Sequence, residues 1–292
     1  MNTTESRRRF RAILAANTCV HPATVQDPIS ARIAEIAGYD LAVVPGSLAA
    51  AAVLGVPDLI LLTLTEFAEQ VRRVARYTNL SLIADADHGY GNALNVQRTV
   101  EELESAGVAA LTLEDTRLPA SFGEADPMVS IAEMTARLRA AVAARIDRDL
   151  VIVARTNAFN VSTTDDAIER LAAYAETGVD AVMIVGVKTI DQVEAASAAV
   201  SVPMILGNVP ANQPALIDLG RLAALRVRVA FQNQPAFQAA VLAQYEVMRH
   251  LHDGGDPKAL PQPLAPGDLM DRVLRRADYD AAQQQYLRDD RT

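Results

Sequence analysis

The chain has 292 residues, of which 50% are hydrophobic and 22% are charged, and its formal net charge is −9. This composition suits a folded protein with a large buried core and excludes an intrinsically disordered chain. The basic residues form no block of the kind that binds a polyanion, so we expect no nucleic-acid partner.

The sequence also argues against a membrane or secreted protein. No apolar run approaches the roughly 18 to 20 residues needed to cross a bilayer. The arginine-rich start lacks the apolar segment of a secretory signal. Cys19 is the single cysteine, which excludes an internal disulfide and a multi-cysteine zinc site. We therefore expect a cytoplasmic protein without a membrane partner.

Short apolar runs alternate with helical patterns along the chain, which is typical of βα units around a parallel sheet. The runs predict eight strands, at residues 18–20, 41–44, 80–84, 109–113, 150–154, 181–185, 203–206 and 227–231. Helical spacing is found, among other places, at residues 27–37, 65–76, 93–106, 130–144, 164–176 and 235–251. Eight such units predict an α/β protein with a (β/α)8 TIM barrel and extra N- and C-terminal helices.

Such a barrel commonly uses about 250 residues. We therefore expect a catalytic barrel domain at residues 1–252 and a C-terminal extension at 253–292, packed on the barrel or on a neighbouring subunit. Residues 253–268 are rich in Gly and Pro and predict a loop, and 269–287 predict one helix. A doubly wound sheet is the alternative, but the Gly-rich turn at 88–92 departs from G-x-G-x-x-G, which disfavours dinucleotide binding.

Active sites of such barrels lie at the C-terminal ends of the strands. The second predicted strand ends in Pro45, Gly46, Ser47 and Leu48, which offer backbone N–H groups and a hydroxyl to an anion at a helix start. An ordinary turn explains this segment equally well.

Two carboxylates follow the third predicted strand, at Asp85 and Asp87. In an extended backbone both side chains point to the same face, where they can share a Mg²⁺ ion. Gly89 and Gly91 permit a tight turn, and Asn92 is a good N-cap for the next helix. A single Asp at this position would be an ordinary turn residue. Two aspartates on the same face favour a metal site instead.

The fourth and fifth predicted strands end in charged residues as well, at Glu114 with Asp115 and at Arg155. Three or four acids then converge, and Mg²⁺, held by one or two carboxylates plus waters, relieves their repulsion. We expect Glu114 to act through such a water. Arg155 grips a substrate carboxylate or forms a structural ion pair with Glu114, and the sequence leaves both open.

Two further residues have alternative readings. Asp58 follows Pro57 and is a second acid, a partner in the magnesium shell, or a helix cap. Lys188 falls just after the sixth predicted strand, where a Schiff-base aldolase carries its nucleophile. It overshoots that strand, and solvated loop lysines are far more frequent, so this mechanism is disfavoured.

The motifs at 85–92, 113–115 and 152–157 resemble, in order and spacing, those of the isocitrate lyase and phosphoenolpyruvate mutase superfamily, over nearly the whole chain. Gly46-Ser47, Pro57-Asp58 and residues 91–96 look closest to its oxaloacetate decarboxylase branch. The resemblance implies an enzyme that uses Mg²⁺, with Mn²⁺ as a substitute, and acts on a 2-oxo acid through an enolate. For oxaloacetate the products are pyruvate and CO2.

The resemblance also implies residue roles and an assembly. Asp85 and Asp87 organise the metal, Glu114 supports its waters, and Asp85 also borders the substrate. Arg155, Asp58 and Ser47 are the implied catalytic residues. The implied substrate contacts are Gly46, Ser47, Leu48, Arg155, Asn208 and Gln234. A homotetramer that exchanges a late helix between barrels is expected.

Three departures bear on the substrate. Residues 117–123 lack the Cys of the superfamily's K-[KR]-C-G-H loop, which disfavours isocitrate-type cleavage. A 2-methylisocitrate-like C–C lyase stays an alternative. Gln234 stands where the decarboxylase branch places a His, and Asn208-Val209 where it places a Tyr. A phosphonopyruvate-type enzyme, in which Asp58 would matter more, is a further alternative, although Thr116-Arg117 replaces its usual Lys. A non-catalytic metabolite-binding barrel is the alternative from another class.

Overall fold

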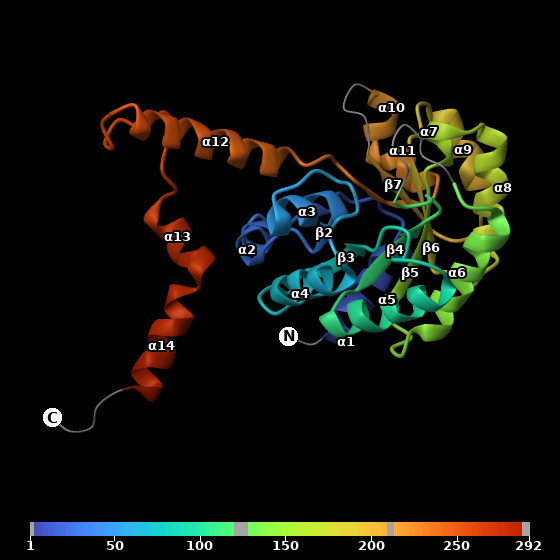
Figure 1. Ribbon diagram of the computed structural model, residues 1–292, viewed down its shortest axis with the longest axis horizontal. Helices are drawn as coiled ribbons and strands as arrows, with labels where there is room; N and C mark the ends of the chain where they lie inside the picture. Colours follow the sequence, from blue (N-terminus) through green and yellow to red (C-terminus); the bar gives the residue numbers. More distant parts are fainter. Residues whose placement is uncertain (1–2, 120–127, 209–212, 288–292) are drawn as a thin grey trace. The chain divides into compact units, whose positions relative to one another are not determined.

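The computed structural model describes residues 3–119, 128–208 and 213–287 (Figure 1). It divides into two compact units, Met1–Asn233 and Gln234–Thr292. The first unit contains one parallel sheet in the order β1 to β8. The strands are β1 (Ala23–Thr24), β2 (Leu41–Val44), β3 (Ser81–Asp85), β4 (Ala110–Glu114), β5 (Val151–Thr156), β6 (Ala181–Val185), β7 (Met204–Gly207) and β8 (Val227–Ala230). This sequential order confirms the predicted α/β class and excludes a doubly wound sheet.

Seven of the predicted strands are confirmed, and the first was wrong. The strand that pairs with β2 is Ala23–Thr24, not residues 18–20. Val20 instead forms an isolated bridge to Val229 of β8, with its N–H donating to Arg228 O at 3.0 Å. Pro22 lies between the two paired segments and has no N–H to donate, so they remain separate.

Alternating strand residues face two different cores, as the two-residue period of a strand requires. One core lies between the sheet and the surrounding helices and includes Ala42, Val44, Leu82 and Ile152. The other, here called the inner core, lies on the opposite face of the sheet and includes Leu41, Val43, Ile83 and Val153. This arrangement explains why the strands read as continuous apolar runs.

Helix α1 (Thr3–Ala15) covers the N-terminal ends of the strands. Its Phe10 and Leu14 join the inner core. Arg7 is buried and donates hydrogen bonds to Val108 O at 3.0 Å and Asp147 Oδ2 at 2.7 Å. Because Val108 precedes β4, these bonds fix α1 to the N-terminal ends of the strands. The C-terminal ends of the strands are therefore left open for a functional site.

The helices of the first unit lie around the outside of the strands (Figure 1). After α1 they are α2 (Pro28–Ile36), α3 (Gly46–Leu54), α4 (Leu64–Ala75), α5 (Ala93–Ala106), α6 (Ile131–Ala144), α7 (Ala158–Val161), α8 (Thr164–Ala175), α9 (Ile190–Ala199), α10 (Pro214–Ile217) and α11 (Leu219–Ala224). Asn92 caps α5 as expected, accepting hydrogen bonds from the N–H groups of Leu94 and Asn95. Gly107 ends α5 with a φ of 100°, which glycine adopts at little cost.

The second unit contains α12 (Pro235–His252), α13 (Gly267–Leu274) and α14 (Arg276–Tyr286). The single helix predicted at 269–287 was wrong, because Arg275 adopts a left-handed φ of 53° and interrupts it. The unit begins at Gln234, and the functional domain boundary expected after residue 252 stays a prediction. Within the described ranges, no helix is both long and apolar enough to cross a bilayer.

Candidate functional site

The N-terminus of α3 meets the end of β2 at the first predicted site segment. Gly46, Ser47 and Leu48 are the first residues of the nine-residue helix. Backbone N–H groups at these positions have no partner within a helix and favour anions. The Leu48 side chain is 1% exposed, so this residue presents only its backbone to the site. The anion-binding role of this turn stays a prediction.

Gly46 is required by the approach of a neighbouring carboxylate. A Cβ at this position would lie 2.9 Å from Asp87 Oδ1 and 3.3 Å from Asp87 Oδ2. The absence of a side chain therefore lets the Asp87 carboxylate lie against the start of α3. The structure thus joins the ends of β2 and β3 in one place, as the sequence predicted.

Asp87 reaches this position by a route that the sequence did not predict. β3 ends at Asp85, and Asp87 has a left-handed φ of 48°. The expected alternation of one extended strand was therefore wrong for Asp87. Asp87 nevertheless lies close enough to Asp85 and Glu114 for their negative charges, after burial, to raise its pKa well above the usual value.

Arg155 binds two of the predicted acids. Its Nη1 donates to both carboxylate oxygens of Asp85, at 2.9 and 2.8 Å, and its Nη2 lies 2.8 Å from Glu114 Oε2. The structure therefore contains the ion pair with Glu114 that the sequence left open, and it adds Asp85. In this arrangement Arg155 fixes the two acidic side chains in a defined orientation.

Negative charge exceeds positive charge in this group. Asp85, Asp87 and Glu114 lie around one guanidinium, and Asp58 lies at the exposed edge. The pKa of Glu114 is raised by burial, with Arg155 opposing that rise. Partial desolvation and the charge of Asp85 raise the pKa of Asp58. A divalent cation would offset this repulsion.

The side chains of Asp85, Asp87 and Glu114 offer only carboxylate oxygens as metal ligands, and hard cations such as Mg²⁺ prefer oxygen ligands. No three acidic, His or Cys side chains of the described ranges form a metal shell on their own. Mg²⁺ commonly needs only one or two carboxylates, with waters completing its octahedron. Asp85 and Asp87 would supply those two, and Glu114 stays available for a bound water.

Asp115 does not join the acidic group, although it follows Glu114 directly. Its side chain is fully buried on the helical side of β4 and accepts hydrogen bonds from Thr156 Oγ1 at 2.8 Å and Tyr174 OH at 2.9 Å. Arg170 Nη1 lies 3.3 Å from the same carboxylate. Adjacent strand residues point to opposite faces, so Glu114 belongs to the site and Asp115 to the structural core.

The sequence missed two polar residues beside the acids. Thr112 Oγ1 donates to Asp85 Oδ1 at 3.0 Å. Thr112 stands two residues before Glu114 on β4, so strand alternation could have revealed it. Tyr90 follows Gly89, and its pKa is raised by burial and by the charges of Asp87 and Asp85. No spacing rule marks Tyr90, because its φ of 58° lies outside regular structure.

Three further residues named from the sequence are Asn208, Gln234 and Lys188. Asn208 follows β7 with a φ of 52°, and Val209 lies outside the described residues. Gln234 opens the second unit, and its contact with a substrate stays a prediction. Lys188 is exposed in the loop before α9. A Schiff-base lysine is normally desolvated, so its exposure counts against that role.

Comparison with known proteins gives consistent matches. The family model described as phosphoenolpyruvate phosphomutase matches residues 10–251. A protein of Rhodopseudomonas palustris (strain ATCC BAA-98 / CGA009), named oxaloacetate decarboxylase, is 50% identical over 272 residues, covering 93% of each chain.

Two solved structures have closely similar folds. A phosphonopyruvate hydrolase complex with oxalate and Mg²⁺ is 31% identical with a TM-score of 0.83, covering 97% of this chain and 99% of that chain. An oxaloacetate acetylhydrolase complex with 3,3-difluorooxalacetate is 28% identical with a TM-score of 0.85, covering 97% of each chain.

Proposed function

The chain belongs to the phosphoenolpyruvate phosphomutase family, and from this premise we propose that it is a Mg²⁺-dependent carboxy-lyase that converts oxaloacetate to pyruvate and CO2. The observation that carries the proposal is the 50% identity, over 93% of both chains, to a protein named oxaloacetate decarboxylase. The acidic group around Arg155 supports it, because its oxygen donors suit the divalent metal that such chemistry uses.

The residues of the site have distinct roles in this proposal. Asp85 and Asp87 would hold Mg²⁺, with Glu114 bonded to its waters, and the ion would act as a Lewis acid toward the substrate's keto and carboxylate oxygens. Arg155 positions Asp85 and Glu114 and supplies a permanent positive charge. The N-terminus of α3, with the Ser47 hydroxyl, binds a carboxylate of the substrate. Asp58 is the acid nearest the exposed edge.

In the reaction the bond between C3 and C4 of oxaloacetate breaks. The C4 carboxylate leaves as CO2, and the electron pair of the broken bond remains on the three-carbon fragment as the enolate of pyruvate. One proton then adds at C3, and we assign its delivery to Asp58 or to water beside it. Positive charge near the developing oxyanion lowers the barrier to the first step.

Removal of the metal is expected to abolish catalysis. Protein stripped with EDTA and dialysed should form pyruvate from oxaloacetate no faster than buffer, and added Mg²⁺ or Mn²⁺ should restore the rate. Free metal also decarboxylates oxaloacetate, so the control contains the same metal without protein. A stripped protein that retains its full rate, or a metal-loaded protein no faster than the metal alone, would contradict the proposal.

A carbon–phosphorus activity is the second candidate, because a phosphonopyruvate hydrolase has a TM-score of 0.83 to this chain. The same preparation assayed with phosphonopyruvate for phosphate release separates the two substrates. We expect kcat/KM to favour oxaloacetate. Binding of metal and 2-oxo acid with no turnover of either substrate would instead indicate a metabolite-binding barrel.

We also propose that the first unit is the catalytic domain and that its sheet closes into a TIM barrel. The Val20 bridge supports closure, because Val20 precedes β1 in the chain and pairs with Val229 of β8. Ala230 N donates to Val20 O at 2.9 Å, which adds a second hydrogen bond at the same place.

The family suggests a tetramer in which α12 packs on a neighbouring subunit. The apolar side chains of Leu242, Tyr245 and Met248 on α12 are 55%, 58% and 66% exposed, which supports an external partner for this helix.

A charge on the apolar face of α12 is therefore expected to dissociate the assembly. Met248→Asp should lower the mass measured by analytical ultracentrifugation, because an unpaired carboxylate would be buried at the interface. Ala236→Asp is the matched control, because it lies nine residues before Tyr245, the middle residue of the apolar face, and at about 3.6 residues per turn this places it on the opposite side of the helix. An unchanged mass for Met248→Asp, or an equal loss for both variants, would contradict this arrangement.

A further inference from the structure

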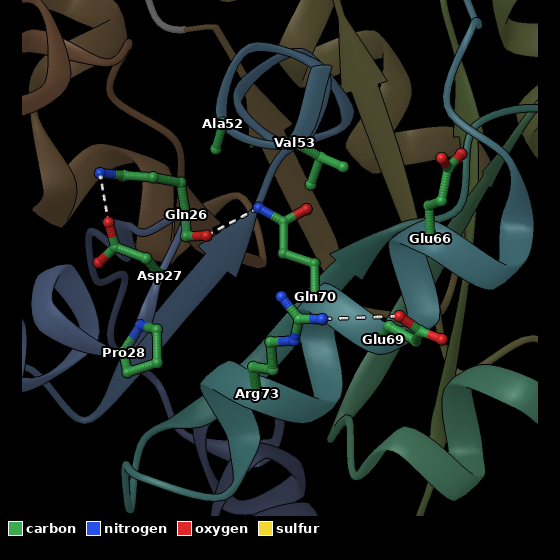
Figure 2. A pocket seen from close by; sticks show the side chains of 9 residues that line it. All are labelled: Gln26, Asp27, Pro28, Ala52, Val53, Glu66, Glu69, Gln70 and Arg73. Carbon is green, nitrogen blue, oxygen red and sulfur yellow. Dashed lines mark hydrogen bonds and ion pairs between the residues drawn. The ribbon is translucent and has the colours of Figure 1, made fainter. Parts of the chain in front are cut away.

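A pocket lies among α2, α3 and α4, and the acidic residues described above do not line it (Figure 2). Its volume is about 370 Å³, which lies within the range of roughly 300 to 1,000 Å³ typical of small-molecule sites. None of its lining residues belongs to the candidate active site, and all of them lie in the first unit.

The pocket contains a buried hydrogen-bond acceptor with no partner. Gln70 is 7% exposed, and its Nε2 donates to Gln26 O at 2.7 Å. This bond fixes the orientation of the amide, so the other end must be Oε1. That oxygen has no hydrogen-bond partner among the described residues. Figure 2 shows it turned away from Gln26 and toward Val53.

Such an acceptor favours a ligand that donates. Leaving a buried polar group unpaired costs about 1 to 3 kcal/mol, and a donor from a ligand would remove this cost. Val53 lines the same pocket as Gln70 and is 41% exposed.

The charged residues around the pocket favour a positively charged ligand. Asp27, Glu66 and Glu69 line it, against the single cation Arg73. Arg73 Nη2 lies 3.7 Å from Glu69 Oε2, and both side chains are largely exposed, so this pair is weak. Carboxylates and an amide oxygen accept hydrogen bonds and repel anions.

We propose that this pocket binds a guanidinium or alkylammonium group on a short aliphatic stem. The charged head donates to Gln70 Oε1 and to Glu66 and Glu69, and the stem packs against Ala52 and Val53. An anion would meet the carboxylates, and an uncharged apolar ligand would leave Oε1 unpaired. The proposal does not depend on the decarboxylase activity.

Calorimetric titration with butylguanidinium tests the chemistry, and butylurea is the uncharged control of nearly the same shape. We expect saturable binding of butylguanidinium and at least a ten-fold weaker affinity for butylurea. Gln70→Met and the double variant Glu66→Gln, Glu69→Gln should each weaken butylguanidinium binding roughly ten-fold, as expected for the loss of about 1.4 kcal/mol. Glu101→Gln, an exposed residue on α5, should bind as the unmodified chain does.

Thermal melting of each variant shows that it is folded before its affinity is compared. No saturable binding, equal binding of butylurea, or full affinity in both Gln70→Met and the double variant would overturn the proposal. The double variant keeps the test valid if Gln70→Met fails to fold, because Glu66 and Glu69 are not buried.

The cationic group can come from a free metabolite or from a Lys or Arg side chain of another chain. Sedimentation with and without butylguanidinium separates these sources. A lower mass on saturation would identify the occupant as a side chain of a second copy. Binding with unchanged mass would identify the site as one for a free cation. Both outcomes support the assigned chemistry.

Discussion

Replacing Asp87 with Asn is expected to lower kcat/KM for oxaloacetate by at least about 10³-fold, a magnitude typical of lost electrostatic stabilisation in an active site. Asn keeps the shape of the side chain and removes the negative charge that would hold Mg²⁺. Asp87 lies within the acidic group and against Gly46. The measurement is the initial rate of pyruvate formation over a series of Mg²⁺ concentrations, with the rate of metal alone subtracted.

A control and a stability measurement make this prediction specific. Asp191→Asn changes an exposed aspartate of α9 and should leave kcat/KM unchanged. Because Asp85 and Glu114 repel the Asp87 carboxylate, metal-free Asp87→Asn should melt no lower than the unmodified chain. Unmodified activity in Asp87→Asn, or a marked loss of its metal-free stability, would contradict the role that we give to this residue.

The largest expected effect on stability is at Asp115, the residue directly after β4. Asp115→Ala is expected to lower the free energy of unfolding by about 4 kcal/mol, the usual cost of breaking a buried ion pair. The change leaves Arg170 without its buried counter-charge and removes the acceptor of Thr156 and Tyr174. Urea denaturation followed by circular dichroism measures the difference.

Asp166 provides the matched comparison, because its Oδ2 lies 3.1 Å from Arg170 Nε but its side chain is 29% exposed. Asp166→Ala should cost about 1 kcal/mol, as expected for a partly solvated pair. If Asp115→Ala cost no more than Asp166→Ala, the buried network around Asp115 would not stabilise the fold as we infer.

Regular periodicity accounts for most of what could be predicted about the fold. Seven strands were recognised because each is an apolar run buried on both faces. The first strand was missed because Ala23–Thr24 contains two residues and follows Pro22. The break between α13 and α14 was missed because Arg275 adopts a left-handed φ without the Gly that usually marks such a position.

The site was predicted less completely, for a physical reason. Strand order brings Gly46, Asp85, Glu114 and Arg155 to one end of the sheet, and this much follows from the sequence. Which carboxylate pairs with Arg155 depends on side-chain geometry between strands, and the sequence did not indicate Asp85. The place of Asp87 depends on the dihedral angles of one turn, which alternation along a strand cannot describe.

The position of helix α1 affects how substrate enters the active site and how product leaves it. The helix covers the N-terminal ends of the strands, where its Phe10 and Leu14 join the apolar inner core. We therefore expect oxaloacetate and pyruvate to use one entrance, at the opposite end. Pyruvate that has not left would block the next oxaloacetate, so product inhibition should be competitive, with added pyruvate raising KM and leaving kcat unchanged.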